Sequence, residues 1–299
     1  MRYLLVMLIV AGMILLSGCE RAGDKGGDSS DDEDMGSSVD VELSVGSEDT
    51  GPDDRISLDV LVRNGYVGSI YDVSGKVLSE PVNLEVDHEW RSISASLKSG
   101  GKKSVSWRFR VKSRDEFVMG ADEEELKVRV KYRTSVRTFA KFSIGESEDD
   151  ESNDKVVSEL DLLPVRVEID PARVGLSGGN EVSVEVTIEK EDKSGEKSGI
   201  LGDELSRIRI EIPDLDDTFD LERSKCEYET DRVNLCSFSS DALSLESVKF
   251  YDGKIRIRLS LVLRNDNLDE LAGQEKSVIV SLEDIWLYKD ATTKIKYQV

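Results

Sequence analysis

Side chains that could act as catalytic bases near neutral pH are almost missing from this chain. His88 is the single histidine among 299 residues, and acids flank it on both sides. Ser–His–Asp and Cys–His catalysis both need such a base. Phosphate-binding loops of the Gly-x-Gly-x-x-Gly or Gly-Lys-Ser/Thr type do not occur, and the 62 acids form no glycosidase motif, although a carboxylate pair stays open. We expect His88 to be an ordinary loop residue and the protein to have no enzymatic activity.

Four aspartates lie close together in Pro-Asp-Leu-Asp-Asp-Thr-Phe-Asp, directly after a predicted strand. Loop carboxylates at this spacing could supply part of the six to eight oxygens that Ca²⁺ requires. The EF-hand pattern is not met, because its central Gly and final Glu are missing. An Asp-rich turn whose side chains cap local backbone amides is the alternative. We expect no metal or other cofactor and keep one weak calcium candidate: Asp214, Asp216, Asp217 and Asp220.

A cationic stretch stands out in a chain whose formal charge is −22. Residues 98–141 contain thirteen Lys or Arg and six acids, and many of the bases fall on outward positions of two predicted strands. If both strands share one sheet, a basic face results, which anionic lipids, acidic envelope polymers or the protein's own acidic segments could meet. A solvated surface is the alternative, and nucleic acid is not expected, since the strips lack exposed aromatics for stacking. The candidate residues are Arg108, Arg110, Lys112, Lys127, Arg129, Lys131 and Arg133.

The first residues have the layout of a signal peptide. Arg2 precedes an apolar run of about fourteen residues, which is too short to span a bilayer as a helix. The run ends in Leu16-Ser17-Gly18-Cys19, which resembles the lipobox of prokaryotic lipoproteins. The resemblance implies cleavage before Cys19 and a diacylglycerol on its thiol, which would hold the protein on the extracytoplasmic face of the cell membrane. A signal peptide cut elsewhere and a short uncleaved anchor are the alternatives.

Besides Cys19, the chain has one pair of cysteines. Cys226 and Cys236 lie ten positions apart in a protein that we expect to be exported. This arrangement favours a disulfide across a hairpin or between neighbouring strands. Two free thiols are one alternative. Zinc is the other, although structural zinc sites want four ligands and His88 is far away in the sequence.

Two acidic segments divide the chain. Residues 20–38 hold seven acids and two bases, and residues 146–155 hold six acids and one base. Both have too few apolar residues to offset the entropy of ordering, so we expect a flexible tether and a linker. The expected parts are a signal peptide (1–18), the lipidated Cys with its tether (19–38), a first domain (39–145), the acidic linker (146–155) and a second domain (156–299).

Both expected domains have the period-two pattern of β-strands. Apolar residues alternate with polar ones at 107–111 and 126–132, and again at 182–188 and 255–261. Turn sequences such as Asp252-Gly253 separate the runs, and no long amphipathic helix competes. The pattern predicts an all-β fold of two antiparallel β-sandwiches. At this level of pattern, without a signature motif, the chain resembles the immunoglobulin-like modules of prokaryotic surface proteins.

These features predict a membrane-anchored extracytoplasmic lipoprotein with a non-catalytic binding or structural role in the cell envelope. An accessory subunit of a membrane protein complex is the first alternative, with the basic face docking a protein. A lipid-tethered solute-binding protein or enzyme is the second, but the alternating helices and strands of solute receptors are missing. The expected partners are the membrane and other envelope proteins or anionic polymers. The sequence specifies no small-molecule ligand.

Overall fold

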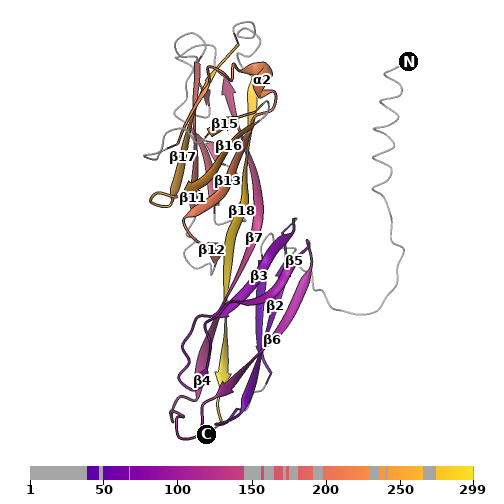
Figure 1. The fold of residues 1–299 in the computed structure, drawn as a ribbon, viewed down its shortest axis with the longest axis vertical. Coiled ribbons are helices and arrows are strands. Elements are labelled where there is room, and N and C mark those ends of the chain that lie inside the picture. The colour runs from indigo at the N-terminus through magenta and orange to yellow at the C-terminus, as the bar shows by residue number, and fades with distance from the viewer. Residues whose placement is uncertain are drawn as a thin grey trace, which may run out of the picture. The chain divides into compact units, whose positions relative to one another are not determined.

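The computed structural model is built almost entirely from β-strands (Figure 1). Within the described residues one short helix, α2 (Leu215–Thr218), interrupts the strands, and no helix there is long and apolar enough to cross a membrane. Neighbouring strands are antiparallel with one exception among the described pairs, so the prediction of an antiparallel all-β protein is confirmed. The structure describes residues 39–46, 50–66, 68–144, 156–157, 165–170, 173–174, 181–190, 198–228, 236–239, 242–264 and 274–298.

Four strands form what we call the first sheet. Their order is β1-β2-β6-β4, and each strand is antiparallel to its neighbour. Alternation along β6 places Trp107 and Phe109 inside and Arg108 and Arg110 outside. The strands are Val39–Val45 (β1), Arg55–Asn64 (β2), Leu84–Glu85 (β4) and Lys102–Val111 (β6).

Nine strands form the central sheet, which draws on both halves of the chain. Seven follow the order β15-β16-β13-β18-β7-β3-β5, while β10 pairs in parallel with β7 and β12 pairs with β18. The strands are Ile70–Val77 (β3), Arg91–Leu97 (β5), Glu123–Ile144 (β7), Arg173–Val174 (β10), Ser198–Ile200 (β12), Glu204–Glu211 (β13), Cys236–Phe238 (β15), Ala242–Lys249 (β16) and Glu275–Lys296 (β18).

Five strands from the later part of the chain form the third sheet. Their order is β14-β17-β11-β9-β8, and all pairs are antiparallel. The strands are Val156–Val157 (β8), Val165–Asp170 (β9), Glu181–Lys190 (β11), Lys225–Tyr228 (β14) and Lys254–Val262 (β17).

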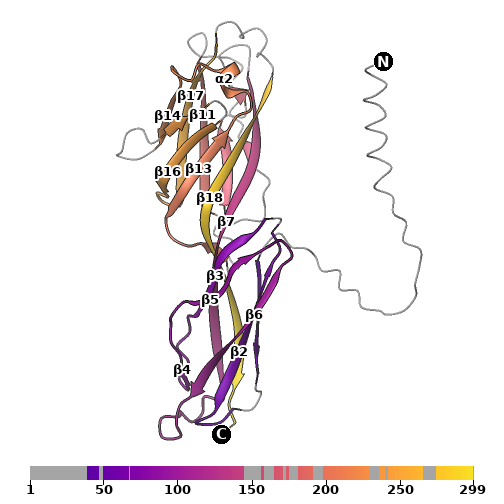
Figure 2. The same ribbon diagram turned by 45° about the vertical axis from the view of Figure 1, so that its right-hand side comes forward.

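Two strands of 22 residues each, β7 and β18, lie side by side in the middle of the central sheet (Figures 1 and 2). Their pairing runs from Glu275 opposite Ser143 to Lys296 opposite Glu123, with one bulge after Leu282. β3 pairs with the early part of β7 and β13 with the early part of β18. Because the two long strands are antiparallel, β3 and β13 flank opposite ends of this ribbon.

The strand pairing differs from the expected division of the chain at residues 146–155. Residues 285–296, which follow that segment, pair with residues 123–134, which precede it. The last strand therefore continues a sheet that begins in the first expected domain. A period-two pattern fixes which face of a strand is buried, but it does not say which strand lies beside it. This is why the long ribbon escaped prediction.

The apolar residues that the alternation assigned to the core are buried. The first and central sheets face each other, as the contact of Trp107 on β6 with Gly75 on β3 shows. A Cβ atom on Gly75 would lie 2.8 Å from Cη2 of the indole, so the indole occupies the space that a side chain would fill. The alternating buried residues are Trp107, Phe109, Val111, Leu126, Val128, Val130, Tyr132, Val182, Val184, Val186, Ile188, Ile255, Ile257, Leu259 and Leu261.

The predicted disulfide between Cys226 and Cys236 is confirmed, and the two Cα atoms are 6.0 Å apart. Cys226 lies on β14 of the third sheet and Cys236 on β15 of the central sheet. The bridge therefore joins two different sheets instead of two strands of one hairpin.

Candidate functional site

The seven cations of the predicted basic face are divided between two sheets. Arg108 and Arg110 lie on β6 of the first sheet, with Lys112 just beyond its end, whereas residues 127–133 lie on β7 of the central sheet. The two sheets pack face to face, so their outward side chains point in opposite directions. The condition for a single basic face, that both strands share one sheet, is not met.

The first-sheet cations do not gather into a site. Arg110 lies 3.4 Å from the exposed carboxylate of Asp53, and Arg108 is opposite Ser57 in the strand register. Lys112 takes part in the fold through its backbone, which bonds to Asn83. An exposed ion pair of this kind contributes little to binding or stability.

A buried carboxylate, Asp290 on β18, pairs with two of the four outward cations on β7. Arg129 donates from Nε and Nη2 to its two oxygens at 2.7 and 2.9 Å, and Lys127 lies 3.2 Å away. Burial raises the pKa of Asp290, but the hydrogen bonds from Arg129 and Lys127 outweigh it, so the pKa is lowered from its ordinary value. The bond to Asp290 raises the pKa of Arg129 in turn. Both cations thus have a carboxylate partner within the molecule, which they share.

Lys131, on the same face of β7, is held in a different way. Its Nζ lies 4.3 Å from the ring centroid of Trp90 and 5.0 Å from that of Trp286. No carboxylate of the described residues lies within salt-bridge distance of this ammonium group. Its neighbour Arg133, by contrast, contacts two aspartates at 2.8 and 3.2 Å. Lys131 therefore keeps an uncompensated charge between two indole rings.

A second ammonium group shares one of these rings. Lys76 on β3 has its Nζ 5.1 Å from the ring centroid of Trp90, and it too has no salt bridge within the described part of the chain. We call the set of Lys76, Trp90, Lys131 and Trp286 the tryptophan–lysine face. Tyr71, 46% exposed, lies on the same sheet opposite Arg133.

Strand alternation positions this face. Lys76, Lys131 and Trp286 are outward residues of the adjacent strands β3, β7 and β18, while Trp90 stands directly before β5. Tyr288, two residues beyond Trp286, supports the arrangement from β18, since its ring stacks on Arg129 at 4.0 Å. Sequence reasoning missed the two tryptophans and Lys76. The available signal was an aromatic residue at an outward position of the alternating run 285–289.

The chemistry of this face is suited to binding anions. An aromatic ring attracts an ammonium group through its quadrupole without neutralising the charge. The N–H donors that do not point at a ring stay available for a carboxylate, sulfate or phosphate, and bonds to such ions are short and strong. The two indoles add flat apolar area. The four side chains include neither a carboxylate nor a thiol.

His88 shows no catalytic arrangement with other described residues. Nδ1 of His88 lies 3.0 Å from the backbone oxygen of Val77. Residues 175–179 read Gly-Leu-Ser-Gly-Gly, which has the letters of a nucleophile elbow, but they lie outside the described residues. The next element after them is the strand β11, whereas an elbow leads into a helix. The prediction of a non-catalytic protein stays a prediction.

The aspartates of the weak calcium candidate lie around α2. Asp214 precedes the helix with a left-handed φ of 57°, and Asp220 accepts a hydrogen bond from the backbone N–H of Glu222. Such a bond is the local capping expected of an Asp-rich turn. The side chain of Asp216 lies outside the described residues, and the described side chains, Asp217 included, form no group of three metal ligands.

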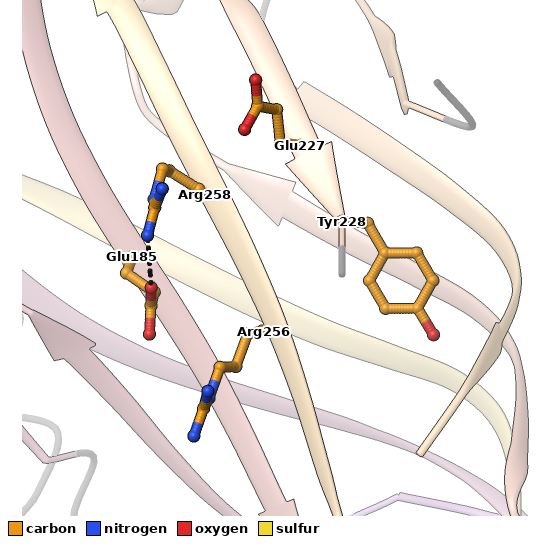
Figure 3. A pocket seen from close by; sticks show the side chains of 5 residues that line it. All are labelled: Glu185, Glu227, Tyr228, Arg256 and Arg258. Carbon is orange, nitrogen blue, oxygen red and sulfur yellow. Dashed lines mark hydrogen bonds and ion pairs between the residues drawn. The ribbon is translucent and has the colours of Figure 1, made fainter. Parts of the chain in front are cut away.

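A shallow pocket of about 230 Å³ opens on the outer face of the third sheet (Figure 3). Its two carboxylates and two guanidinium groups come from adjacent strands, and Arg258 lies 3.5 Å from Glu185. Because Glu227 stands opposite Arg258 on the other side, the charges balance within the pocket. This balance favours an ordinary solvated surface. The lining residues are Glu185, Glu227, Tyr228, Arg256 and Arg258.

No protein-family model matches the chain, and no curated protein matches its sequence. Among solved structures it is similar to the secreted serine protease VesC from Vibrio cholerae, with 9% identity, 90% of this chain and 53% of that chain covered, and a TM-score of 0.20. The chain thus spans about half the length of that protease.

Two further similar structures are a carbohydrate-binding module and an adhesin. A carbohydrate-binding module of the β-sandwich superfamily has 10% identity over 83% of this chain and 98% of its own, with a TM-score of 0.19. The collagen adhesin of S. aureus has 10% identity over 84% and 82%, with a TM-score of 0.11. These TM-scores are too low to support a conclusion about function.

Proposed function

We propose that the protein is a lipid-anchored component of the cell envelope with a non-catalytic binding role, and that its tryptophan–lysine face binds an anionic partner. In this proposal Cys19, which lies outside the described residues, carries the lipid on the extracytoplasmic side of the membrane. The first sheet and the third sheet, each together with part of the central sheet, would form two immunoglobulin-like sandwich modules. The observation that carries the binding role is the ammonium group of Lys131, held between Trp90 and Trp286 without a carboxylate.

The physical argument rests on a contrast within one strand. Lys127, Arg129 and Arg133 all have carboxylate partners, so an incoming anion would have to displace an existing pair. Lys131 offers its charge without that cost. Two ammonium groups on one indole, Lys131 and Lys76, repel each other, and an anion between them would relieve the repulsion.

Binding to polygalacturonate, a polymer of carboxylates, tests the proposed face. Lys131→Gln should weaken binding by about fivefold to tenfold, since one close charge pair in water contributes about 1 kcal/mol or more. The matched control is Lys141→Gln on the same strand, because Lys141 is already paired with Glu275 at 3.1 Å. Tryptophan emission reports binding directly, as Lys131 touches two indoles. Equal affinity of the wild type and Lys131→Gln would refute the face.

The anchor is tested separately with labelled fatty acid in growing cells. The wild type should incorporate the label, and Cys19→Ser should not, because the lipobox thiol is the acceptor. Fractionation should then move the Cys19→Ser protein out of the membrane. Incorporation of the label into Cys19→Ser would show that the lipid is attached to another residue and would refute Cys19 as the anchor.

A further inference from the structure

Two loops at the far end of the first sheet expose apolar side chains. Val82 is 48% exposed, Val118 is 46% exposed and Met119 is 71% exposed. Single exposed apolar residues are common on protein surfaces, whereas several that gather in one place are a candidate for an interaction site. We call these three residues the apolar tip.

The apolar tip is held in place by a fully buried side chain, Asn83. Its Oδ1 accepts a hydrogen bond from the N–H of Val118 at 2.8 Å, and its Nδ2 donates to the carbonyl oxygen of Val118 at 3.2 Å. Its backbone N–H bonds to the carboxylate of Glu124, and its backbone oxygen accepts from Lys112. These bonds fix the two loops to each other and direct Val82 and Met119 outward. The tip is therefore preorganised, which lowers the entropy cost of docking.

Acidic side chains surround the apolar tip. Residues 113–125 contain six acids and one base. Asp115, Glu116, Asp122 and Glu125 are all exposed, and the only base of the segment is Arg114. This charge disfavours an anionic lipid surface as the partner of the tip. A partner should instead offer cations next to flat apolar area.

We propose that the apolar tip of one copy docks on the tryptophan–lysine face of a second copy. This inference rests on the proposed function and names the anionic partner of that face. The face has what the tip lacks: two ammonium groups without carboxylates, in Lys76 and Lys131, and partly exposed aromatic rings, in Trp90 and Tyr71. Met119 would contact an aromatic ring, a favourable pairing for a thioether.

The contact is heterologous, because the tip and the face are different surfaces of the chain. Repetition of such a contact produces an open array unless a rotation closes it into a ring. A lipid anchor would confine the copies to one plane and raise their effective concentration, so a weak contact is enough. The inferred role is therefore self-association at the membrane surface.

The test is a cross-link between two singly substituted forms of the full-length protein in detergent. Copies with Met119→Cys are mixed with copies with Ser74→Cys, since Ser74 is opposite Lys131 in the register and points outward on the face. Mild oxidation should give a disulfide-linked dimer of the two forms. The control replaces Ser74→Cys with Phe139→Cys, because Phe139 is 66% exposed elsewhere on β7. Its cross-linking should be at least about tenfold slower.

Three results would overturn the inference: no cross-link, equal cross-linking of Phe139→Cys, or equal cross-linking among Met119→Cys copies alone. The expected cross-link should also disappear when polygalacturonate is added, since both would occupy one face. Polygalacturonate binding that depends on Lys131, without any cross-link, would reject self-association and leave the proposed function standing. If the protein neither forms the cross-link nor binds polygalacturonate through Lys131, the tryptophan–lysine face itself is rejected as a binding site.

Discussion

Replacing Asp290 by Asn separates the folding role of the cations on β7 from their binding role. The Asp290 carboxylate receives two hydrogen bonds from Arg129 and one ion pair from Lys127 in a buried position. Asn has the same shape but no charge, so both cations lose their partner while remaining on the outer face of the sheet.

The stability cost follows from the burial of this carboxylate. Removing one partner of a buried pair costs about 3–5 kcal/mol, but Arg129 and Lys127 are partly exposed and regain water. We therefore expect Asp290→Asn to lower the free energy of unfolding by about 2–3 kcal/mol at neutral pH. Urea unfolding at several pH values measures it.

The pH dependence has a definite sign. The pKa of Asp290 is lowered from 3.8, so its stabilising contribution is fully present above that pH. The contribution is lost as the pH falls through the folded-state pKa. The difference in the free energy of unfolding between the wild type and Asp290→Asn should thus be constant from neutral pH down to about pH 5 and should become smaller below pH 3.8.

The same substitution should strengthen anion binding. Removing the Asp290 carboxylate adds one net positive charge beside a bound anion, which contributes about 1 kcal/mol in water, so polygalacturonate should bind about fivefold more tightly. Glu275→Gln is the matched control, since it removes the same charge but frees Lys141 elsewhere on the ribbon. That exposed pair is worth about 0–1 kcal/mol, and we expect no change in binding. A folded, less stable Asp290→Asn protein that binds no more tightly would refute the role of charge on this face.

Two further predictions concern packing and cross-linking. Gly75→Ala should lower the free energy of unfolding by about 1–3 kcal/mol, because the new Cβ would lie 2.8 Å from Trp107. Gly68→Ala is the control and should be nearly neutral, because open space surrounds Gly68. Calorimetry compares the two variants. Replacing both Cys226 and Cys236 by Ala should lower the free energy of unfolding by about 2.7 kcal/mol by the chain-entropy model. Reducing conditions should lower the stability of the wild type by the same amount and leave the stability of the double variant unchanged.

The sequence was sufficient to predict which residues are buried on each strand. Leu126, Val128, Val130 and Tyr132 are buried as their alternation with cations requires. Alternation is a local property of the pleated strand, so it survives whatever partner the strand has. The disulfide was predictable as well, since two cysteines in a chain that is expected to be exported have few other uses.

The pairing of distant strands was beyond the sequence. Lys131 and Trp286 are separated by most of the second half of the chain, and only the β7–β18 register brings them to one face. Whether each cation on β7 has a carboxylate partner also depends on such contacts between distant strands. Arg129 meets Asp290 across the ribbon and is neutralised, while Lys131, two residues later, is opposite Tyr288 and keeps its charge. No property of the residues 127–133 alone distinguishes the two.

Salt should affect anion binding in two opposing ways, because an uncompensated cation stands on a chain of net charge −22. At about 0.01 M salt the screening length is about 30 Å, so an anion at Lys131 is repelled by most of the molecule. At about 0.15 M it is about 8 Å, which leaves the local attraction and removes the distant repulsion. Near 1 M, at about 3 Å, even the local attraction is screened. Polygalacturonate affinity should therefore pass through a maximum at intermediate salt in the wild type, and Lys131→Gln should flatten it. A steady fall from the lowest salt upward would mean that the acidic surface does not reach the site.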